Sequence, residues 1–332
     1  MQQGFWNVGI RKRMKATLRA SAAVAAVALA FTAAPLTGYA VRIEPAAQEG
    51  VTSNIFGSAG SESEFYRQIS QTITQGQESL TITLDQPVSD QEEFIELCRQ
   101  AVYQARRDYP ESFLSNHTEF VYYYNESGYY QVTFSFRYLD LTGEQKQAMF
   151  NEVDSIVAQA RAQTGGDTVG MLRYFQQALC ERAEYDFAAA RSDSDHYPNS
   201  YHAYGALMEG KSVCQGYAYA FKLLCDRAQI PCWIVTGTYG DEPHAWNYVW
   251  VNNNYYLVDV TWDDANNRPA DSAFFLAGRD HAANYHVEDN CAPGTLAARS
   301  YSETSTTVIR RARQQTNQEE SSSRTLAGAA KG

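Results

Sequence analysis

The sequence has little positive charge and no grouping of cysteines that would hold a zinc ion. Its 332 residues carry 27 lysines and arginines against 38 aspartates and glutamates, a formal net charge of -11. An acidic chain is repelled by nucleic acid and by anionic membrane surfaces, which disfavours both as partners. None of the six cysteines forms a CxxC pair, and no cysteine and histidine cluster has the spacing of zinc ligands. We therefore predict no nucleic-acid partner, no metal site and no cofactor.

The sequence also lacks an apolar run of the usual transmembrane length. Its longest, residues 20–34, has about 15 residues, whereas a spanning helix needs roughly 20. This run follows five basic residues and precedes the small-residue site Gly38-Tyr39-Ala40, which is the order found in a secretory signal peptide. No cysteine follows the run, so a lipid anchor is not predicted. We expect residues 1–40 to be removed, and the protein to be secreted, extracellular or associated with the cell envelope. Membrane attachment is expected only without cleavage.

The chemistry that the sequence does offer centres on Cys214. Ser212 and Gln215 fit a capping box, with Ser212 at the N-cap, before an apolar helical face. This pattern predicts Cys214 at the second helical position, where backbone amides lack acceptors and the helix dipole is positive. Such a position favours a nucleophilic thiolate and leaves the Cys214 amide available to stabilise an oxyanion. The alternative is a small buried residue, because free cysteine is often buried.

A nucleophilic cysteine needs a base, and the base needs a group that orients it. His244 and Asp259 lie in two predicted strands, residues 244–251 and 255–262. A three-residue loop between the strands would place their side chains on opposite faces. A two-residue Asn252-Asn253 turn pairs residue 251 with 254, which puts Asp259 diagonal to His244 on the same face. Asparagine tolerates the positive φ of such a turn, so the favoured hairpin brings imidazole and carboxylate together.

Each of these residues also has a purely structural alternative. A histidine at the start of a strand is usually a hydrogen-bonded polar residue, and Asp259 lies in an apolar run where an unpaired carboxylate would be costly. His202, His281 and His286 lack comparable partners in the sequence.

The cysteine count bears on disulfides, which export would permit. If Cys214 stays free, five cysteines remain, and an odd number cannot all pair within the chain. We interpret Cys98, Cys180 and Cys225 as core residues. Whether Cys232 pairs with Cys291 is left open.

The remaining chain divides by composition and periodicity. Residues 41–60 are rich in small and polar types and are predicted to be a linker. Residues 61–164 alternate helical and strand patterns, including a tyrosine-rich hairpin, and are predicted to form a small α+β domain. Residues 165–290 carry the cysteine, histidine and aspartate. Residues 291–332 are polar, and we expect them to be a low-complexity, disordered tail.

Three motifs in this order resemble those of the transglutaminase-like superfamily, and its bacterial secreted branch most closely. They are Gly210-Lys211-Ser212-Val213-Cys214-Gln215-Gly216-Tyr217-Ala218, His244-Ala245-Trp246-Asn247 and Tyr256-Leu257-Val258-Asp259-Val260-Thr261-Trp262. The resemblance covers about residues 165–290. It implies an α+β, papain-like core in which a cysteine helix packs on an antiparallel sheet. No counterpart of the calcium sites of the eukaryotic enzymes is visible in the sequence.

The resemblance also implies roles for single residues. Cys214 would be the nucleophile, His244 the general base and acid, and Asp259 the group that orients it. Gln215 and Tyr204 are candidates to complete the oxyanion hole. Independently of the resemblance, Trp246, which is near His244 in the sequence, is a candidate for substrate contact, and core packing explains it equally well.

Together these features predict a secreted thiol acyltransferase that acts on amide bonds of proteins or peptides, including those of the cell surface, through a thioester. Transfer to water instead of an amine would make it a cysteine protease or amidase. A non-catalytic binding module of the same fold is the third interpretation. Members of that kind generally lose one of the three residues, and this chain keeps them all.

Overall fold

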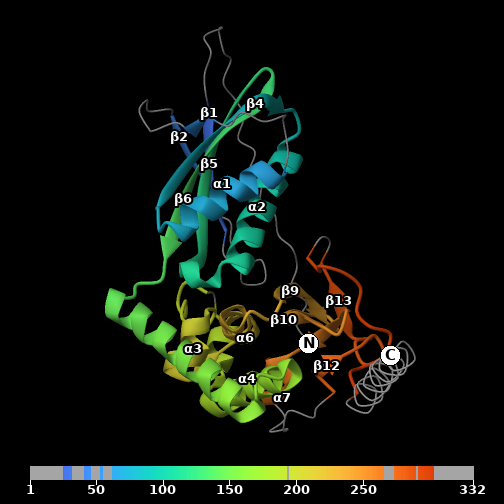
Figure 1. The fold of residues 1–332 in the computed structure, drawn as a ribbon. Helices are drawn as coiled ribbons and strands as arrows, with labels where there is room; N and C mark the ends of the chain where they lie inside the picture. Colours follow the sequence, from blue (N-terminus) through green and yellow to red (C-terminus); the bar gives the residue numbers. More distant parts are fainter. Residues whose placement is uncertain are drawn as a thin grey trace, which may run out of the picture.

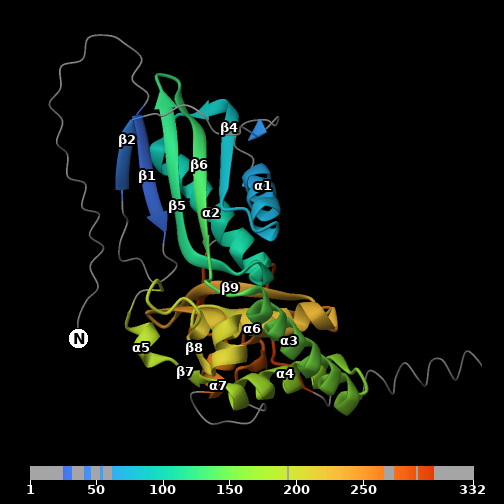
Figure 2. The same cartoon turned by 90° about the vertical axis from the view of Figure 1, so that its left-hand side faces the viewer.

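A computed structural model of the chain describes residues 25–31, 41–45, 53–54, 62–192, 194–264, 273–288 and 291–302. These residues form two modules stacked end to end (Figures 1 and 2). The N-terminal module is built on a six-stranded sheet and the C-terminal module on a five-stranded antiparallel sheet. No helix in the described part of the chain is long and apolar enough to span a membrane.

In the N-terminal module, two helices cover one face of a sheet with the strand order β2-β1-β5-β6-β4-β3 (Figure 1). Its elements are β1 (Ala25–Phe31), β2 (Val41–Pro45), β3 (Ser53–Asn54), α1 (Glu62–Thr74), β4 (Ser79–Val88), α2 (Gln91–Asp108), a 3-10 turn η1 (Pro110–Ser112), β5 (Leu114–Asn125) and β6 (Gly128–Tyr138). The predicted hairpin is present, since Asn125 pairs with Gly128 across β5 and β6. Alternate residues of the strands, including Phe120 and Phe134, face Phe65 and Phe94 of the helices in one apolar core.

Strand β1 comes from the predicted signal segment and pairs antiparallel with both β5 and β2. The rest of residues 1–40, and most of the predicted linker at 41–60, lie outside the described residues. Cleavage of the signal segment therefore stays a prediction.

The C-terminal module packs helices against a sheet with the order β12-β11-β10-β9-β13. Its elements are α3 (Gly143–Thr164), α4 (Thr168–Arg182), β7 (Glu184–Tyr185), α5 (Phe187–Ala190), η2 (Gly205–Glu209), β8 (Lys211–Ser212), α6 (Cys214–Ala228), β9 (Cys232–Tyr239), β10 (Glu242–Val251), β11 (Asn254–Val258), α7 (Val260–Asp264), β12 (Phe275–Ala277) and β13 (Tyr285–Val287). This is the α+β arrangement of a cysteine helix on an antiparallel sheet that the sequence predicted.

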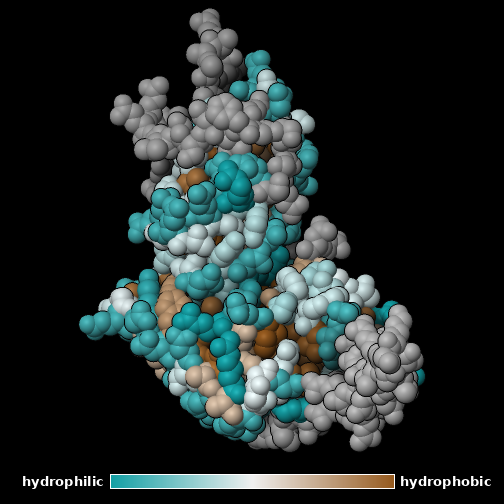
Figure 3. Space-filling view, viewed as in Figure 1, coloured by the Kyte–Doolittle hydropathy of each residue, from teal (hydrophilic) through white to brown (hydrophobic). Residues whose placement is uncertain are grey.

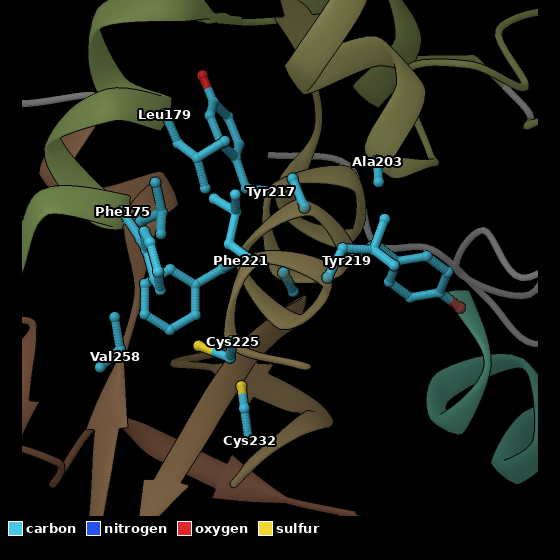
Figure 4. Packing of buried hydrophobic residues seen from close by; sticks show 14 of the residues in the cluster. Phe175, Leu179, Ala203, Tyr217, Tyr219, Phe221, Cys225, Cys232 and Val258 are labelled. Carbon is cyan, nitrogen blue, oxygen red and sulfur yellow. The ribbon is translucent and has the colours of Figure 1, made fainter. Parts of the chain in front are cut away.

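Helix α6 is the central element of this module, and most of its residues are buried. Phe175 and Leu179 of α4 pack on one of its sides, and Val258 and Cys232 of the sheet lie beneath it (Figure 4). The face of the sheet that packs on the helices uses alternate residues such as Val249. The other face uses Trp246 and Tyr248, as alternation along β10 predicts.

Helix α3 packs in the core of the C-terminal module rather than with the sheet before it. Its buried residues Met149, Val153 and Ile156 belong to the same apolar cluster as α4 and α6. The predicted boundary after residue 164 is therefore misplaced, and by packing the division falls between β6 and α3. Periodicity identified the helix but could not show which core its apolar face would join.

The prediction of a disordered tail from residue 291 is wrong for residues 291–302. Leu296 is buried and forms a parallel bridge with Tyr255, and the Tyr301 amide donates to the Leu276 carbonyl at 2.9 Å. Leu296 packs on the sheet face opposite α6, so backbone pairing and one buried leucine order a stretch that has no apolar period. Residues 303–332 lie outside the described residues.

The two modules meet along the chain between α2 and β5. The Pro110 carbonyl accepts a hydrogen bond from His202 Nε2 at 2.8 Å, and the rings of Phe113 and His202 stack. Phe113 belongs to the core of the C-terminal module. In the view of Figure 1, the surface of the N-terminal module is mostly hydrophilic, whereas hydrophobic side chains gather in a hollow of the C-terminal module (Figure 3).

Candidate active site

The first turn of α6 is held in place by a small strand pair rather than by the predicted capping box. Helix α6 begins at Cys214 with Val213 at the N-cap, where no side chain caps the helix. Ser212 lies in β8 and pairs with Tyr185 of β7, and its hydroxyl has two carbonyl acceptors within reach, that of Val213 at 3.0 Å and that of Ser200 at 3.4 Å. The capping-box prediction is wrong because strand pairing and a neighbouring carbonyl engage Ser212. Cys214 is thus the first helical residue, and its amide still has no intrahelical acceptor.

Gly216 allows the first turn to approach its neighbours closely. A Cβ at this position would lie 2.4 Å from Ser212 Oγ and 2.5 Å from the Ser200 carbonyl oxygen. Any larger residue would therefore push the helix start, and with it Cys214, away from the segment that packs against it.

The hairpin that carries His244 and Asp259 has the predicted register. Val251 pairs with Asn254 and Asn247 with Val258. Asn252 and Asn253 have φ values of 49° and 62°, the left-handed conformations of a two-residue type I′ turn. Beyond Val258 the predicted strand does not continue to residue 262, because the chain turns into α7. Asp259 lies at this transition.

The His244 imidazole and the Asp259 carboxylate form a buried hydrogen-bonded pair. Nε2 of His244 lies 2.6 Å from Oδ2 of Asp259, and 8% and 1% of the two side chains are exposed. The same Oδ2 accepts the hydroxyl of Tyr285 at 2.8 Å. Oδ1 accepts the amides of Thr261 at 3.0 Å and Trp262 at 3.3 Å at the start of α7. These bonds hold the carboxylate in one orientation and stabilise its negative charge.

This carboxylate controls the protonation of His244. Burial would lower the pKa of the imidazole, but the charge of Asp259, its hydrogen bond and the adjacent Cys214 outweigh burial and raise the pKa to about 10. The imidazole is therefore protonated at neutral pH. Because Nε2 faces Asp259, Nδ1 is the nitrogen left for the Cys214 side chain, whose hydrogen bond contributes to the shift.

Aromatic rings enclose the imidazole. The rings of Tyr239, Trp246, Trp262 and Tyr285 have centroids between 5.9 and 6.3 Å from that of His244, and Trp246 stacks on it. Such walls limit the access of water to the pair and strengthen its electrostatic interaction. Trp246 is 1% exposed, so the residue predicted for substrate contact instead supports the histidine from within the core.

Comparison with known proteins finds a family match around these three residues. Residues 155–260 match the family described as the transglutaminase-like superfamily, and this range includes Cys214, His244 and Asp259. These residues form a transglutaminase-like domain. The N-terminal module and Tyr285 lie outside the matched range.

Among curated proteins, kyphoscoliosis peptidase of Homo sapiens is 31% identical over 96 residues, which are 25% of this chain and 14% of that protein. The Mus musculus protein of the same name is 30% identical over 96 residues, with the same coverage. The chain thus spans about 14% of the length of these relatives. A solved structure described as a TGase has a TM-score of 0.32 and 14% identity, over 55% of this chain and 50% of that one.

The side chain of Gln215 is not available for the predicted oxyanion role in this transglutaminase-like domain. Its Nε2 donates to Asn116 Oδ1 at 2.8 Å and to the Tyr201 carbonyl at 2.9 Å, and Asn116 Nδ2 donates back to its Oε1 at 3.2 Å. Both amide hydrogens are engaged, so Gln215 joins the helix start to the N-terminal module. The sequence could not reveal this role, since Asn116 is 99 residues away.

Tyr204, the other oxyanion candidate, is buried in the core with α4 and α6, and its backbone amide donates to Nδ1 of His202. Tyr185 is the tyrosine that the structure brings to the site. Burial raises the pKa of the Tyr185 hydroxyl, and the nearby Cys214, Tyr201 and Asp259 add to the shift. The hydroxyl therefore remains protonated and able to donate. The pairing of β7 with β8, which no local pattern predicts, places it there.

No group of three or more histidine, cysteine or acidic side chains among the described residues could hold a metal ion. The chemistry that the described residues of the transglutaminase-like domain offer is that of a thiol beside a buried, carboxylate-bound imidazole.

Proposed function

We propose that this protein is a thiol acyl-transfer enzyme that acts on carboxamide groups of proteins or peptides. The observation that carries the proposal is the buried 2.6 Å contact between His244 and Asp259, beside a cysteine at the first position of a helix. A cysteine, a histidine and a carboxylate in this relation can activate a nucleophile, orient its base and return a proton to the leaving group.

In the proposed reaction, Cys214 reacts as a thiolate paired with the protonated imidazole of His244, and this thiolate attacks the carbonyl carbon of the amide. The carbonyl π electrons move to oxygen, and the oxyanion accepts hydrogen bonds from the Cys214 amide and the Tyr185 hydroxyl. Collapse of this intermediate breaks the carbon–nitrogen bond, and the imidazolium gives its proton to the departing ammonia or amine. A thioester with Cys214 remains. An acceptor amine or water then attacks the thioester carbon and gives a proton to the now neutral imidazole. The carbon–sulfur bond breaks, and the thiolate and the protonated imidazole are restored.

The acceptor decides whether the enzyme is a transglutaminase or a hydrolase. The relatives matched here carry the name peptidase, which favours water as acceptor. The family name favours an amine. We propose cysteine acyl transfer as the common chemistry, with hydrolysis as the second candidate outcome. The signal segment supports a location outside the cytoplasm, where proteins or peptides of the cell envelope are the proposed substrates.

The reduced protein would be incubated with a mixed peptide pool and a primary amine, and the products followed by mass spectrometry beside Cys214→Ala. Amine incorporated at glutamine by the wild type alone would identify transamidation. Cleaved peptides would identify a protease, and glutamine converted to glutamate a deamidase.

A Cys214→Ala variant as active as the wild type would contradict the proposal. So would an inert wild type whose Cys214 reacts with iodoacetamide no faster than its other thiols, which would favour a binding module instead.

A further inference from the structure

Two cysteines outside the active site lie next to each other at the other end of α6. Cys225 lies in the last turn of the helix and Cys232 is the first residue of β9. In the core, the sulfur atom of Cys232 points toward Cys225, whose own sulfur atom points to the side (Figure 4). The residues are 0% and 4% exposed, so the two thiols are shielded from solvent.

The pKa of the Cys225 thiol depends on Cys232. Burial is the main cause that raises the pKa of the Cys225 thiol, and a hydrogen bond with the Cys232 side chain adds to the shift. Asn247 Nδ2 also donates to the Cys232 sulfur at 3.6 Å, which fixes this side chain from the opposite direction. The arrangement in Figure 4 and this contribution to the pKa thus both place the Cys232 sulfur next to the Cys225 side chain.

The backbone between the two cysteines is a tight, fully positioned turn. Gln229 adopts a left-handed φ of 62°, and the Ile230 amide donates to the Cys225 carbonyl at 2.9 Å. The Pro231 carbonyl accepts the Trp250 amide at 3.1 Å, and the Cys232 carbonyl accepts Lys222 Nζ at 3.3 Å. Both ends of the connection are therefore fixed, which holds the backbone of the two cysteines in place.

We propose that Cys225 and Cys232 form a disulfide that ties the last turn of α6 to the central sheet. The reaction is thiol–disulfide exchange with an external disulfide such as oxidised glutathione. One cysteine displaces a glutathione thiol and becomes a mixed disulfide. The second then displaces the other glutathione thiol. The protein loses two hydrogens and two electrons, and one glutathione disulfide becomes two thiols.

This pairing resolves the choice that the sequence left open for Cys232. Cys291 has a different environment, because its sulfur accepts the Thr236 amide at 3.0 Å at the edge of β9. Cys98 is buried in the core of the N-terminal module, and the Cys180 sulfur contacts the Val260 carbonyl. With Cys225 and Cys232 joined, Cys214 keeps its free thiol in an oxidising compartment, while the far end of the helix that carries it is covalently fixed.

The test uses the full chain, incubated with oxidised glutathione both in the folded state and during refolding from denaturant. We expect a mass loss of about two hydrogens and four remaining thiols of six after denaturation. Trypsin cuts after Lys222 and Arg227, and cuts poorly between Arg268 and Pro269. The disulfide would therefore join the peptide 223–227 to the peptide 228–279, and reduction would separate them.

Cysteine variants identify which two thiols form the disulfide. Cys291→Ser should keep the cross-linked peptide, whereas Cys225→Ala and Cys232→Ala should lose it. Oxidation should raise the unfolding temperature of the wild type and of Cys291→Ser, and leave that of the double variant Cys225→Ala/Cys232→Ala unchanged. Six free thiols after both treatments would overturn the proposal, and so would a cross-link between Cys232 and Cys291. Because peptide mapping is done on the wild type, misfolding of a variant would not obscure the outcome. Acyl transfer is not measured, so failure here would leave the proposed function intact.

Discussion

His202 and His244 are both buried in the C-terminal module, but their surroundings shift their pKa values in opposite directions. His202 donates to the Pro110 carbonyl through Nε2 and accepts the Tyr204 amide through Nδ1, and burial lowers its pKa to about 4. His244 has a carboxylate where His202 has a carbonyl, and its pKa rises to about 10. Burial is common to both, so the buried negative charge decides which histidine carries a proton.

His202 and His244 therefore illustrate two roles of a buried histidine side chain, one structural and one in proton transfer. A neutral histidine held by two backbone groups joins the modules and takes no part in proton transfer. A histidine beside a buried carboxylate holds a proton that it can give to a leaving group. Each of the four predictions below changes one residue.

The largest effect is expected for Asp259→Asn, which makes the surroundings of His244 resemble those of His202. Without the charge, burial should bring the pKa of His244 from about 10 to below 6.5, measured by NMR titration of the imidazole. Turnover should fall by roughly 10³- to 10⁴-fold, since the base loses both its orientation and its charge partner. Asp226→Asn makes the same change at a carboxylate paired with Lys222 near the other end of α6, and should leave both quantities nearly unchanged. A His244 that still titrates near 10 in Asp259→Asn would refute this explanation.

The second effect is an acid sensitivity due to His202. Unfolded, this imidazole takes up a proton near pH 6.5, whereas in the folded protein it does so only near pH 4. The unfolded state therefore binds more protons between these values, and stability falls as the pH falls. The loss should reach about 3 kcal/mol below pH 4.

Urea unfolding at pH 7 and pH 4.5 would measure this dependence. In His202→Gln the difference between the two pH values should shrink by most of that amount, whatever the variant's stability at pH 7. His286→Gln, a change at an exposed histidine, should keep the wild-type difference. An unchanged pH dependence in His202→Gln would show that other groups cause the acid sensitivity.

A smaller effect is expected from Tyr285→Phe, which removes one of the hydrogen bonds to the Asp259 carboxylate. The bond is charge-assisted and buried, so its loss should lower kcat by about tenfold while KM stays close to that of the wild type. Tyr248→Phe removes a hydroxyl from another buried tyrosine in the same apolar cluster and serves as the control. A change confined to KM would place Tyr285 in substrate binding rather than in positioning Asp259.

The smallest effect is expected from Asn116→Ala, which removes the reciprocal amide bonds with Gln215. The free energy of unfolding should fall by about 1 kcal/mol, because a partly buried pair of hydrogen bonds between the modules is lost. Asn151→Ala breaks the exposed amide bond with Gln147 and should change stability by less than about 0.5 kcal/mol. Equal losses in the two variants would mean that the contact between the modules contributes no more than a surface pair.

The features that the sequence predicted correctly depend on local patterns. The apolar spacing of α6 and the two asparagines of the turn were sufficient to place His244 beside Asp259. The features it missed depend on distant partners. In the sequence Ser212 fits a helix cap, whereas in the structure it pairs with Tyr185. Gln215 has no partner near it in the sequence, whereas in the structure it binds Asn116 of the other module. Tyr285 lies on β13, in a tract with no pattern that distinguishes it from other sheet tyrosines.

The turn at Asn252 and Asn253 also limits how this chain can change its length over evolution. Neither residue takes part in the site, yet a single inserted residue there would shift the pairing of β10 and β11 by one and turn Asp259 to the opposite face of the sheet. Such an insertion would remove the carboxylate from His244 while Cys214, His244 and Asp259 all remained in the sequence. In related chains, the number of residues between the histidine and the aspartate, counted modulo two, is therefore as informative about activity as the presence of the residues themselves.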